Sequence, residues 1–405
     1  MRLPLLVLFS VSTTVTFKND KQKKDDCGGQ WDGSNLPKAS MHFVVSLYKL
    51  VSSKTANAPP NFFLSPFSIY TTLAMLGLGA RSSTQQQILD AMCLNASQAD
   101  KILKDDFKNF LEKSRTKQGE VEFRFSNWLF LEKSISPDTQ YQQDLVNYYS
   151  TYIYVINFKD PLKAERIINE KISGHADGKI EDLVSNVNRW TLMVLLDYVK
   201  FNAKWETPFA FQGTKRGLFK VNKLKTIEVK MMHQVGQFKT FKDHAHDCVV
   251  VQVPYTDQLV LLFVVPNNGD LDEVENQLSI RLIGRYLNKA KTSLLDLYIP
   301  KIFVQQEVNV QSALMKMGIL QAFNETADLS GISKVPGLKV SGILHKTLIN
   351  IAENQTESTE GGIVNIFTLP SALEFKIDRP FLALVYNKPM NTIELLGRVI
   401  DPSED

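Results

Sequence analysis

A long polar segment between two strand-like runs, close to the C-terminus, constrains the fold of this chain more than any other feature. The segment reads Ala352-Glu-Asn-Gln-Thr-Glu-Ser-Thr-Glu-Gly-Gly362, and an apolar stretch separates it from the last strand-like runs. Loops of this length are uncommon in compact domains and are usually functional or disordered. We therefore expect a domain that carries a long exposed loop near its C-terminus.

The rest of the chain has the composition of an ordinary globular protein. Of its 405 residues, 44% are hydrophobic and 22% are charged, which is sufficient for a large core. The 46 basic and 43 acidic residues give a net charge of +3, and this balance does not indicate nucleic acid as a partner. Neither a repeat nor a linker interrupts residues 38–405, so we expect one α+β domain and a monomer.

The first 17 residues have the layout of a secretory signal peptide. Arg2 precedes an apolar run, small residues follow, and a charged stretch begins at Lys18. This run is too short for a membrane span, and no later apolar run approaches ~18 residues. We expect a secreted, extracellular protein that makes no contact with membranes. Residues 18–37 are polar and contain several glycines, which predicts a disordered tail.

The three cysteines are Cys27, Cys93 and Cys248. An odd number in a secreted chain leaves at least one thiol free or intermolecular. Cys248 begins an apolar strand-like run, which favours a buried and inert thiol, and the pairing of the other two cysteines is open. N-glycosylation is predicted at three sequons, which begin at Asn95, Asn324 and Asn354.

The spacing of apolar residues predicts helices in the first part of the chain and a mixture with strands after it. Ser65 is a candidate N-cap for a helix that begins at Pro66. The apolar run over residues 191–201 predicts a strand that is buried on both faces. Residues 308–317 predict a helix that ends at Gly318.

The sequence contains none of the common motifs for catalysis or cofactor binding. It has no Gly-x-Ser-x-Gly elbow, phosphate-binding loop or His-Glu-x-x-His pair, so we expect neither enzyme activity nor a cofactor. His244 and His246 lie between Asp243 and Asp247, and these residue types suit a metal ion. A polar loop before the strand at Cys248 explains the same pattern, and we predict no metal site.

Several separated sequence blocks resemble the serpin family and occur in the order expected for it. The first is residues 61–69 (NFFLSPFSI) with 76–80 (LGLGA), followed by 178–184 (GKIEDLV) and 201–206 (FNAKWE). The later blocks are Met231-Met232, Pro300-Lys301, residues 317–319 (MGI), residues 327–332 (ADLSGI), Arg379-Pro380-Phe381 and Gly397-Arg398-Val399. Their spacing over residues 40–403 is most similar to the secreted antitrypsin-like branch.

The resemblance implies a fold and a mechanism. The fold has three β-sheets with eight to nine helices and an exposed reactive loop, here at about residues 353–375. In inhibitory serpins a serine protease cleaves this loop and is trapped as an acyl-enzyme, while the loop inserts as a new central strand of the largest sheet. Insertion adds ladder hydrogen bonds and buries side chains. The resemblance thus implies an inhibitor of an extracellular serine protease.

The hinge at the start of this loop departs from the inhibitory pattern. Glu353 matches the hinge glutamate of the family. After insertion Thr356, Ser358 and Glu360 would face the core, because side chains alternate along a strand. An unpaired carboxylate at position 360 is costly to bury, and Gln355 replaces a usual glycine.

The bond that a protease would cleave has two candidate positions. The commonest spacing in the family places it between Leu369 and Pro370, although a proline after the cleaved bond suits serine proteases poorly. A shift of two residues places it between Phe367 and Thr368, which suits a chymotrypsin-like enzyme. These departures keep an alternative open, a non-inhibitory serpin that carries a small hydrophobic hormone or binds a protein partner.

Two regions that control sheet opening in the family map onto this chain. The shutter maps to Ser65, Ser68, Asp197 and His345, with Asp197 in place of the usual asparagine. An aspartate beside His345 would favour the imidazolium form and make sheet opening sensitive to pH. The alternative is a neutral, hydrogen-bonded pair. Trp205, in the breach, is expected to be a packing residue at the top of the main sheet.

Overall fold

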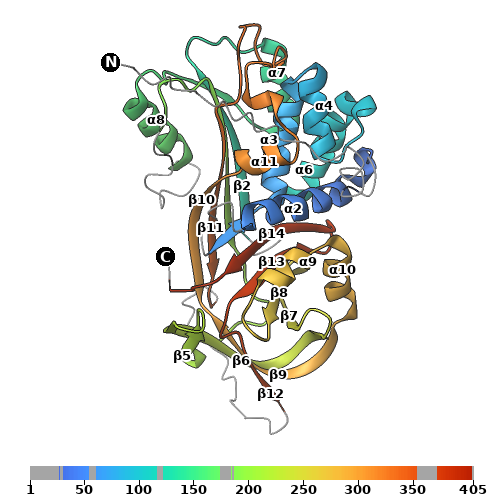
Figure 1. The fold of residues 1–405 in the computed structure, drawn as a ribbon, viewed down its shortest axis with the longest axis vertical. Helices are drawn as coiled ribbons and strands as arrows, with labels where there is room; N and C mark the ends of the chain where they lie inside the picture. Colours follow the sequence, from blue (N-terminus) through green and yellow to red (C-terminus); the bar gives the residue numbers. More distant parts are fainter. Residues whose placement is uncertain are drawn as a thin grey trace, which may run out of the picture.

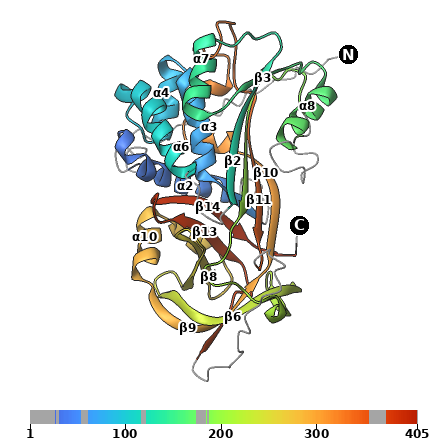
Figure 2. The same cartoon turned by 180° about the vertical axis from the view of Figure 1, so that it is seen from behind.

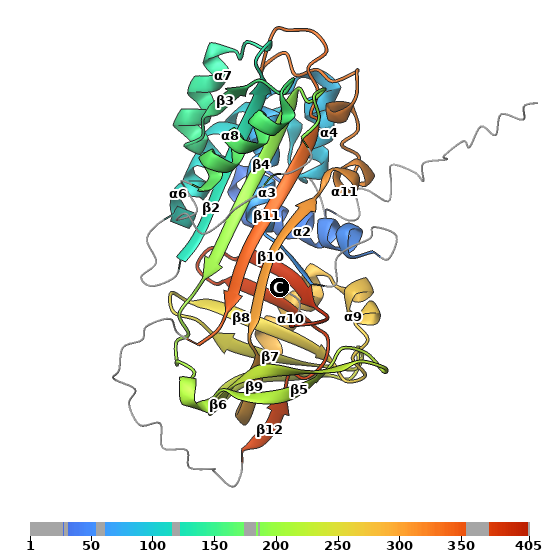
Figure 3. The same cartoon turned by 90° about the vertical axis from the view of Figure 1, so that its left-hand side faces the viewer.

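The computed structural model describes residue 27 and residues 31–53, 61–115, 122–173, 184, 187–353 and 372–403. Within these ranges a five-stranded sheet runs along the upper half of the molecule (Figure 1). Its broad face is seen in Figure 3. The strands, in spatial order, are β10 (Ile302–Asn309), β11 (Gly342–Ile351), β4 (Met193–Asn202), β2 (Glu122–Glu132) and β3 (Ile153–Ile156).

Strand β4 is buried on both of its faces, as its apolar run predicts. Leu195 packs into the core under the N-terminal helices, whereas its neighbour Leu196 packs toward α8 (Pro161–Ser173). Figures 1 and 2 show α8 on the opposite side of the sheet from α3 (Pro66–Gly79). Successive side chains of a strand point to opposite faces, so a continuous apolar run is what a strand between two layers requires.

The remaining described strands form one nine-stranded sheet in the lower half of the molecule, a path of eight strands with a ninth paired beside it. Strand β6 pairs with β5 and β9 through residues 226–240 and with β7 only through residues 239–243. The path therefore consists of two sheet regions that share β6, and with the five-stranded sheet they make the three-sheet architecture that the resemblance implies. The strands are β1 (Phe62–Leu64), β14 (Thr392–Val399), β13 (Phe381–Asn387), β8 (Leu259–Pro266), β7 (Cys248–Pro254), β6 (Thr226–Asp243), β9 (Lys291–Pro300) and β12 (Leu373–Lys376), with β5 (Lys215–Lys220) paired to β6.

Most helices cover one face of the five-stranded sheet, while α9 and α10 pack beside the nine-stranded sheet (Figure 1). If α5, the π-helical turn after it and α6 are counted as one, the described residues contain nine helices, within the predicted range. Besides α3 and α8, they are α2 (Leu36–Ser52), α4 (Ser82–Ala91), α5 (Ala99–Lys101), α6 (Phe107–Arg115), α7 (Thr139–Asp144), α9 (Asp272–Gln277), α10 (Ile280–Lys289) and α11 (Gln311–Lys316).

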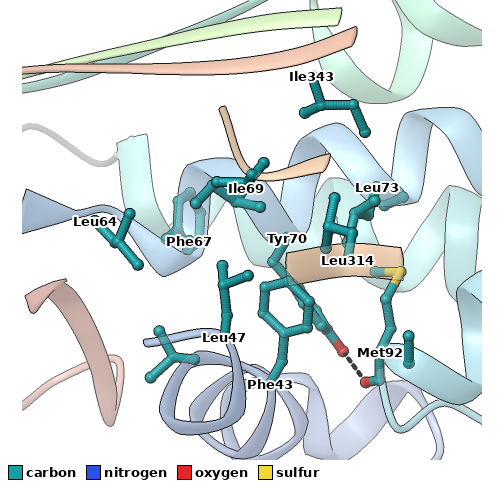
Figure 4. Packing of buried hydrophobic residues seen from close by; sticks show 14 of the residues in the cluster. Phe43, Leu47, Leu64, Phe67, Ile69, Tyr70, Leu73, Met92, Leu314 and Ile343 are labelled. Atoms are coloured by element: carbon teal, nitrogen blue, oxygen red, sulfur yellow. Dashed lines mark hydrogen bonds between the residues drawn. The ribbon is translucent and has the colours of Figure 1, made fainter. Parts of the chain in front are cut away.

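Helix α3 is the centre of the main core. It begins as predicted, with the Ser65 side chain accepting a hydrogen bond from the Ser68 backbone N–H and Pro66 in the first turn. All of its residues are buried, as expected of a helix that is hydrophobic all round. Figure 4 shows its side chains between helix α2 and strand β11, and the Tyr70 hydroxyl donates a hydrogen bond to the Met92 carbonyl at 2.9 Å.

The structure corrects the prediction of a disordered tail for the part of residues 18–37 that it describes. Cys27 forms a disulfide with Cys93, and the Trp31 backbone N–H donates a hydrogen bond to the Cys93 carbonyl at 2.9 Å. Helix α2 already begins at Leu36. The covalent link and the packing of Trp31 offset the low hydrophobicity on which the prediction rested. Cys248 is the buried free thiol.

The helix predicted over residues 308–317 is shorter than expected. Val308 and Asn309 belong to β10, where they pair with His345 and Leu344 of β11. Helix α11 spans only Gln311–Lys316. Pairing with a neighbouring strand thus outweighs local helical spacing at this boundary.

Candidate functional site

The two central strands of the five-stranded sheet are parallel and directly paired. The register of β4 and β11 runs from the pair Val194–Gly342 to the pair Phe201–Ile349. The strands outside them, β2 and β10, are antiparallel to their neighbours. A chain that turned back after β11 and entered between these strands would be antiparallel to both. Antiparallel pairing is slightly more stable per residue than parallel pairing, so this junction is suited to accept another strand.

A buried polar contact joins the two strands across the junction. His345 on β11 and Asp197 on β4 are fully buried and are hydrogen-bonded through Nδ1 and Oδ1. The Ser65 backbone N–H donates to Nε2 of the same imidazole at 2.9 Å. Because Nε2 accepts this hydrogen bond, the ring proton belongs on Nδ1, where it is donated to Asp197. The geometry favours the second predicted alternative, a neutral and hydrogen-bonded imidazole.

Asp197 and Ser68 are incompletely satisfied in this cluster. Asp197 Oδ2 and Ser68 Oγ are both buried and have no hydrogen-bond partner in the described part of the chain. Ser65, His345 and Asp197 are neighbours, but they are not arranged for nucleophilic catalysis. The imidazole Nε2 is engaged by a backbone amide, and all three residues are inaccessible to solvent, whereas a catalytic base must reach the proton that it removes.

Sequence patterns missed two residues that tie this cluster to its surroundings. The Asn127 side chain on β2 donates to the Ser68 carbonyl at 3.2 Å and to Thr72 Oγ1 at 2.7 Å, and so links the sheet to α3. Thr347 on β11 donates to the Phe63 carbonyl of β1 at 3.4 Å. Each contact joins segments that are far apart in the chain, so local periodicity contains no signal for it.

Trp205 contributes a hydrogen bond in addition to the packing that was predicted for it. Its indole stacks on Tyr255 with ring centroids 4.1 Å apart. Its Nε1–H donates to the carbonyl of Ala352 at 2.9 Å. Ala352 directly follows β11 and precedes the predicted hinge, so this bond attaches the start of the polar segment beside the C-terminal ends of β4 and β11.

Glu353 is held in place by two partners. Its carboxylate is 2.7 Å from the Lys301 Nζ and accepts a hydrogen bond from the Thr214 hydroxyl, and its side chain is 6% exposed. Burial alone would raise the pKa of Glu353, but the hydrogen bonds from Lys301 and Thr214 outweigh burial and hold this pKa below its ordinary value. The hinge glutamate is therefore ionised and anchored at neutral pH.

Many of the predicted site residues lie outside the described residues. Of the three sequons, Asn324 is exposed and Asn95 is partly exposed, and each side chain forms a turn with its own Thr326 or Ser97. The predicted positions outside the described part are the signal peptide over residues 1–17, Asn354, the hinge residues Gln355, Thr356, Ser358 and Glu360, and both candidate bonds, Leu369–Pro370 and Phe367–Thr368.

His246, near Cys248, contacts two charged protein side chains. His246 Nδ1 lies 2.7 Å from Asp243 Oδ2, and Arg285 donates to the same oxygen at 2.5 Å. Within the residues that the structure describes, no group of three or more His, Cys, Asp or Glu side chains is placed to hold a metal ion.

Comparison with known proteins supports the assignment of the fold. The family model for serpin (serine protease inhibitor) matches residues 38–402. Thyroxine-binding globulin of the pig is 34% identical over 89% of this chain and 88% of its own length. Serine protease inhibitor A6 of Xenopus laevis is 32% identical over 91% of this chain and 84% of its own.

Solved structures agree with this result. Human thyroxine-binding globulin superposes with a TM-score of 0.83 and 30% identity over 91% of this chain and 99% of its own. Mouse protein Z-dependent protease inhibitor superposes with a TM-score of 0.83 and 26% identity over 91% of this chain and 98% of its own. The chain belongs to the serpin family. Its similarity to the thyroxine-binding globulins agrees with the antitrypsin-like branch.

Proposed function

We propose that this serpin inhibits an extracellular serine protease by cleavage of its loop and insertion of the loop between β4 and β11. The observation that supports this most directly is the direct parallel pairing of β4 and β11 in a five-stranded sheet. An entering strand would replace one parallel ladder by two antiparallel ladders. Each additional backbone hydrogen bond contributes about 0.5–1.5 kcal/mol, so a strand of ordinary length supplies a substantial driving force.

The contacts at the C-terminal end of β11 support a loop that is held back until it is cut. The Glu353 carboxylate, its Lys301 and Thr214 partners, and the bond from Trp205 to Ala352 hold the segment where it leaves β11. Insertion requires the segment to turn away from these contacts. The starting state is thus stabilised by a kinetic barrier rather than by being the most stable arrangement.

Secretion is part of the same proposal. The predicted signal peptide and the sequons at Asn95, Asn324 and Asn354 are typical of an extracellular protein. The disulfide between Cys27 and Cys93 adds support, because disulfides persist mainly in oxidising compartments. Among the described helices, none combines the length and the apolar character that crossing a membrane requires.

A second function, transport of a small hydrophobic hormone, is favoured by the comparisons. Relatives at 34% and 33% identity are thyroxine-binding globulins, and one solved relative is a complex with thyroxine. The loop also departs from the inhibitory pattern at three residues, each of which suits cleavage or insertion poorly: Gln355, Glu360 and Pro370. Under this alternative the loop would not need to trap a protease.

One experiment distinguishes the two functions. The purified protein is incubated with trypsin-like and chymotrypsin-like proteases, and the products are analysed for an SDS-stable complex and for the melting temperature after loop cleavage. An inhibitor forms the complex, and its melting temperature rises strongly when the loop inserts. Absence of both effects, together with saturable binding of thyroxine, would establish the carrier. The double variant Phe367→Ala with Leu369→Ala is the control. It changes the residue before each candidate cleaved bond and leaves the sheet unchanged.

A further inference from the structure

A strongly basic hairpin lies at the end of the molecule where the polar segment leaves and rejoins the fold. It consists of β5, the turn after it and the start of β6, and it contains six basic residues and one acidic residue over positions 215–230. The whole chain, by contrast, has 46 basic and 43 acidic residues. Figures 1 and 3 show the hairpin at the same end as β12.

One face of this hairpin is open to solvent. Opposed residues of two paired strands share a face, and the exposed pairs are Arg216–Lys230, Leu218–Glu228 and Lys220–Thr226. The side chains between them, such as Phe219 and Val229, are buried in the sheet core. We call the exposed set the outer face. It consists of Arg216, Leu218, Lys220, Thr226, Glu228 and Lys230.

The hairpin contacts the described chain both before and after residues 354–371. Thr214, which directly precedes β5, donates its hydroxyl hydrogen to Glu353 at the first end. The Lys220 backbone N–H, at the last residue of β5, donates to the Asp378 carbonyl at 2.7 Å, just after β12. A macromolecule that contacts the chain next to Glu353 therefore lies close to this hairpin, whereas β12, where the described chain resumes, pairs with β9.

The outer face combines positive charge with exposed apolar side chains. Arg216 pairs with Glu228 at 2.8 Å, whereas Lys220 and Lys230 form no ion pair within the described part of the chain. Leu218 is 67% exposed, and Leu224 in the adjoining turn is 99% exposed. A sulfated polysaccharide would use the charges but not the leucines. A protein interface uses both, because apolar contacts form its centre and charges surround them.

We propose that the outer face, with Leu224, is a docking surface for the protease that attacks the neighbouring loop. This protease carries acidic and apolar side chains beside its active site. The inference rests on the proposed inhibitory function and adds the chemistry of the target. Complementary charge on the two surfaces accelerates encounter, and this effect decreases as salt screens it.

The test uses the full-length protein with a cationic and an anionic chymotrypsin that share the same primary specificity. The hairpin variant is Lys220→Glu with Lys230→Glu. Its control, Lys108→Glu with Lys289→Glu, makes the same charge change on exposed positions of α6 and α10. Association rate constants are measured from formation of the SDS-stable complex at 0.05 M and 0.3 M NaCl. A third variant, Leu218→Ser with Leu224→Ser, retains the charge of the wild type.

We expect the wild type to react faster with the anionic enzyme, and the hairpin variant to lose about tenfold in rate with it at low salt. The loss should be smaller at 0.3 M NaCl, and the control variant should keep the wild-type rate. The leucine variant should be slower at both salt concentrations, because apolar contacts are not screened.

Two results overturn the docking surface and differ from each other. If complexes form but the hairpin and control variants react equally, the docking surface is wrong while the inhibitory function stands. If neither the wild type nor any variant forms a complex with either enzyme, the inhibitory function and the docking surface both fail. Retention on immobilised heparin is measured in parallel. Loss of heparin binding in the hairpin variant with unchanged protease rates would assign the face to a polyanion instead.

Discussion

His345 and Asp197 form a buried hydrogen bond across the two strands, β11 and β4, that insertion would separate. The contact joins side chains at directly opposed positions in the register of a parallel pair. Asp197 accepts this hydrogen bond through Oδ1, and its other carboxylate oxygen, Oδ2, is buried without a partner in the described residues. The junction is thus held by a contact that is itself incompletely satisfied.

Asp197→Asn should stabilise the uncleaved protein. The substitution keeps a carbonyl oxygen for the His345 N–H and removes a partly unpartnered buried carboxylate. We expect the free energy of unfolding to rise by about 1–3 kcal/mol, measured by urea denaturation at neutral pH. Asp197→Ala is the control, since it also removes the acceptor and should lower stability. A lower urea midpoint for Asp197→Asn than for the wild type would contradict this account.

Glu353→Gln should weaken the anchor at the C-terminal end of β11. A charge-assisted hydrogen bond contributes about 1.5–3 kcal/mol. We expect the free energy of unfolding to fall by an amount near the lower end of this range, because the amide retains one acceptor. The matched control is Glu374→Gln, whose exposed ion pair with Lys376 contributes at most about 1 kcal/mol. Equal melting temperatures for the two variants would show that the buried pair has no greater effect than the exposed one.

The same anchor should be sensitive to acid. The pKa of Glu353 is lowered in the folded protein from its ordinary value of 4.5. Its contribution is therefore fully present above about pH 4.5 and is lost as the pH falls through the lower folded-state pKa. Stability measured from pH 6 to pH 3 should fall more in the wild type than in Glu353→Gln. Parallel curves for the two proteins would exclude this role.

The disulfide between Cys27 and Cys93 should stabilise the N-terminal region strongly. It closes a loop with a sequence separation of 66, and removal of a native disulfide typically costs about 2–5 kcal/mol. We expect Cys27→Ala with Cys93→Ala to lower the melting temperature clearly. Cys248→Ala, which changes the buried free thiol, should have a smaller effect. Calorimetry of both variants tests the difference, and an equal loss would be evidence against the disulfide.

Glu360→Ala should speed loop insertion if the loop enters the sheet in the expected register. The substitution removes a carboxylate that would otherwise be buried at an inward position of the new strand. We expect a higher yield of SDS-stable complex per cleavage event, with Glu357→Ala as the control at an outward position. An unchanged yield for both variants would mean that position 360 is not buried on insertion.

The sequence was sufficient where the signal is local or is shared with the family. Ser65 and Pro66 begin a helix as predicted, and the apolar run after residue 191 is a strand buried between two layers. The pairing of His345 with Asp197 followed from the family pattern. What the sequence did not show are contacts between distant segments, such as Thr214 with Glu353 or Asn127 with Thr72. These depend on how strands are ordered in space, which local periodicity does not encode.

The N-terminal tail illustrates the same limit for covalent structure. Residues 18–37 are polar, and their composition alone indicated disorder. The disulfide between Cys27 and Cys93 depends instead on two Cα atoms lying 5.5 Å apart. Such proximity is a property of the folded chain and cannot be deduced from the spacing of three cysteines.

Contacts at the two ends of β5 connect this short strand to the chain before and after residues 354–371. Thr214, just before β5, holds Glu353, and Lys220, at the end of β5, holds Asp378 after β12. An extended strand over this interval is roughly 20 Å long. A lineage that lengthened or shortened β5 would move one of these two contacts relative to the other without altering any residue from 354 to 371. Under the proposed inhibitory function, the choice of protease could then evolve through a strand that the protease does not cut.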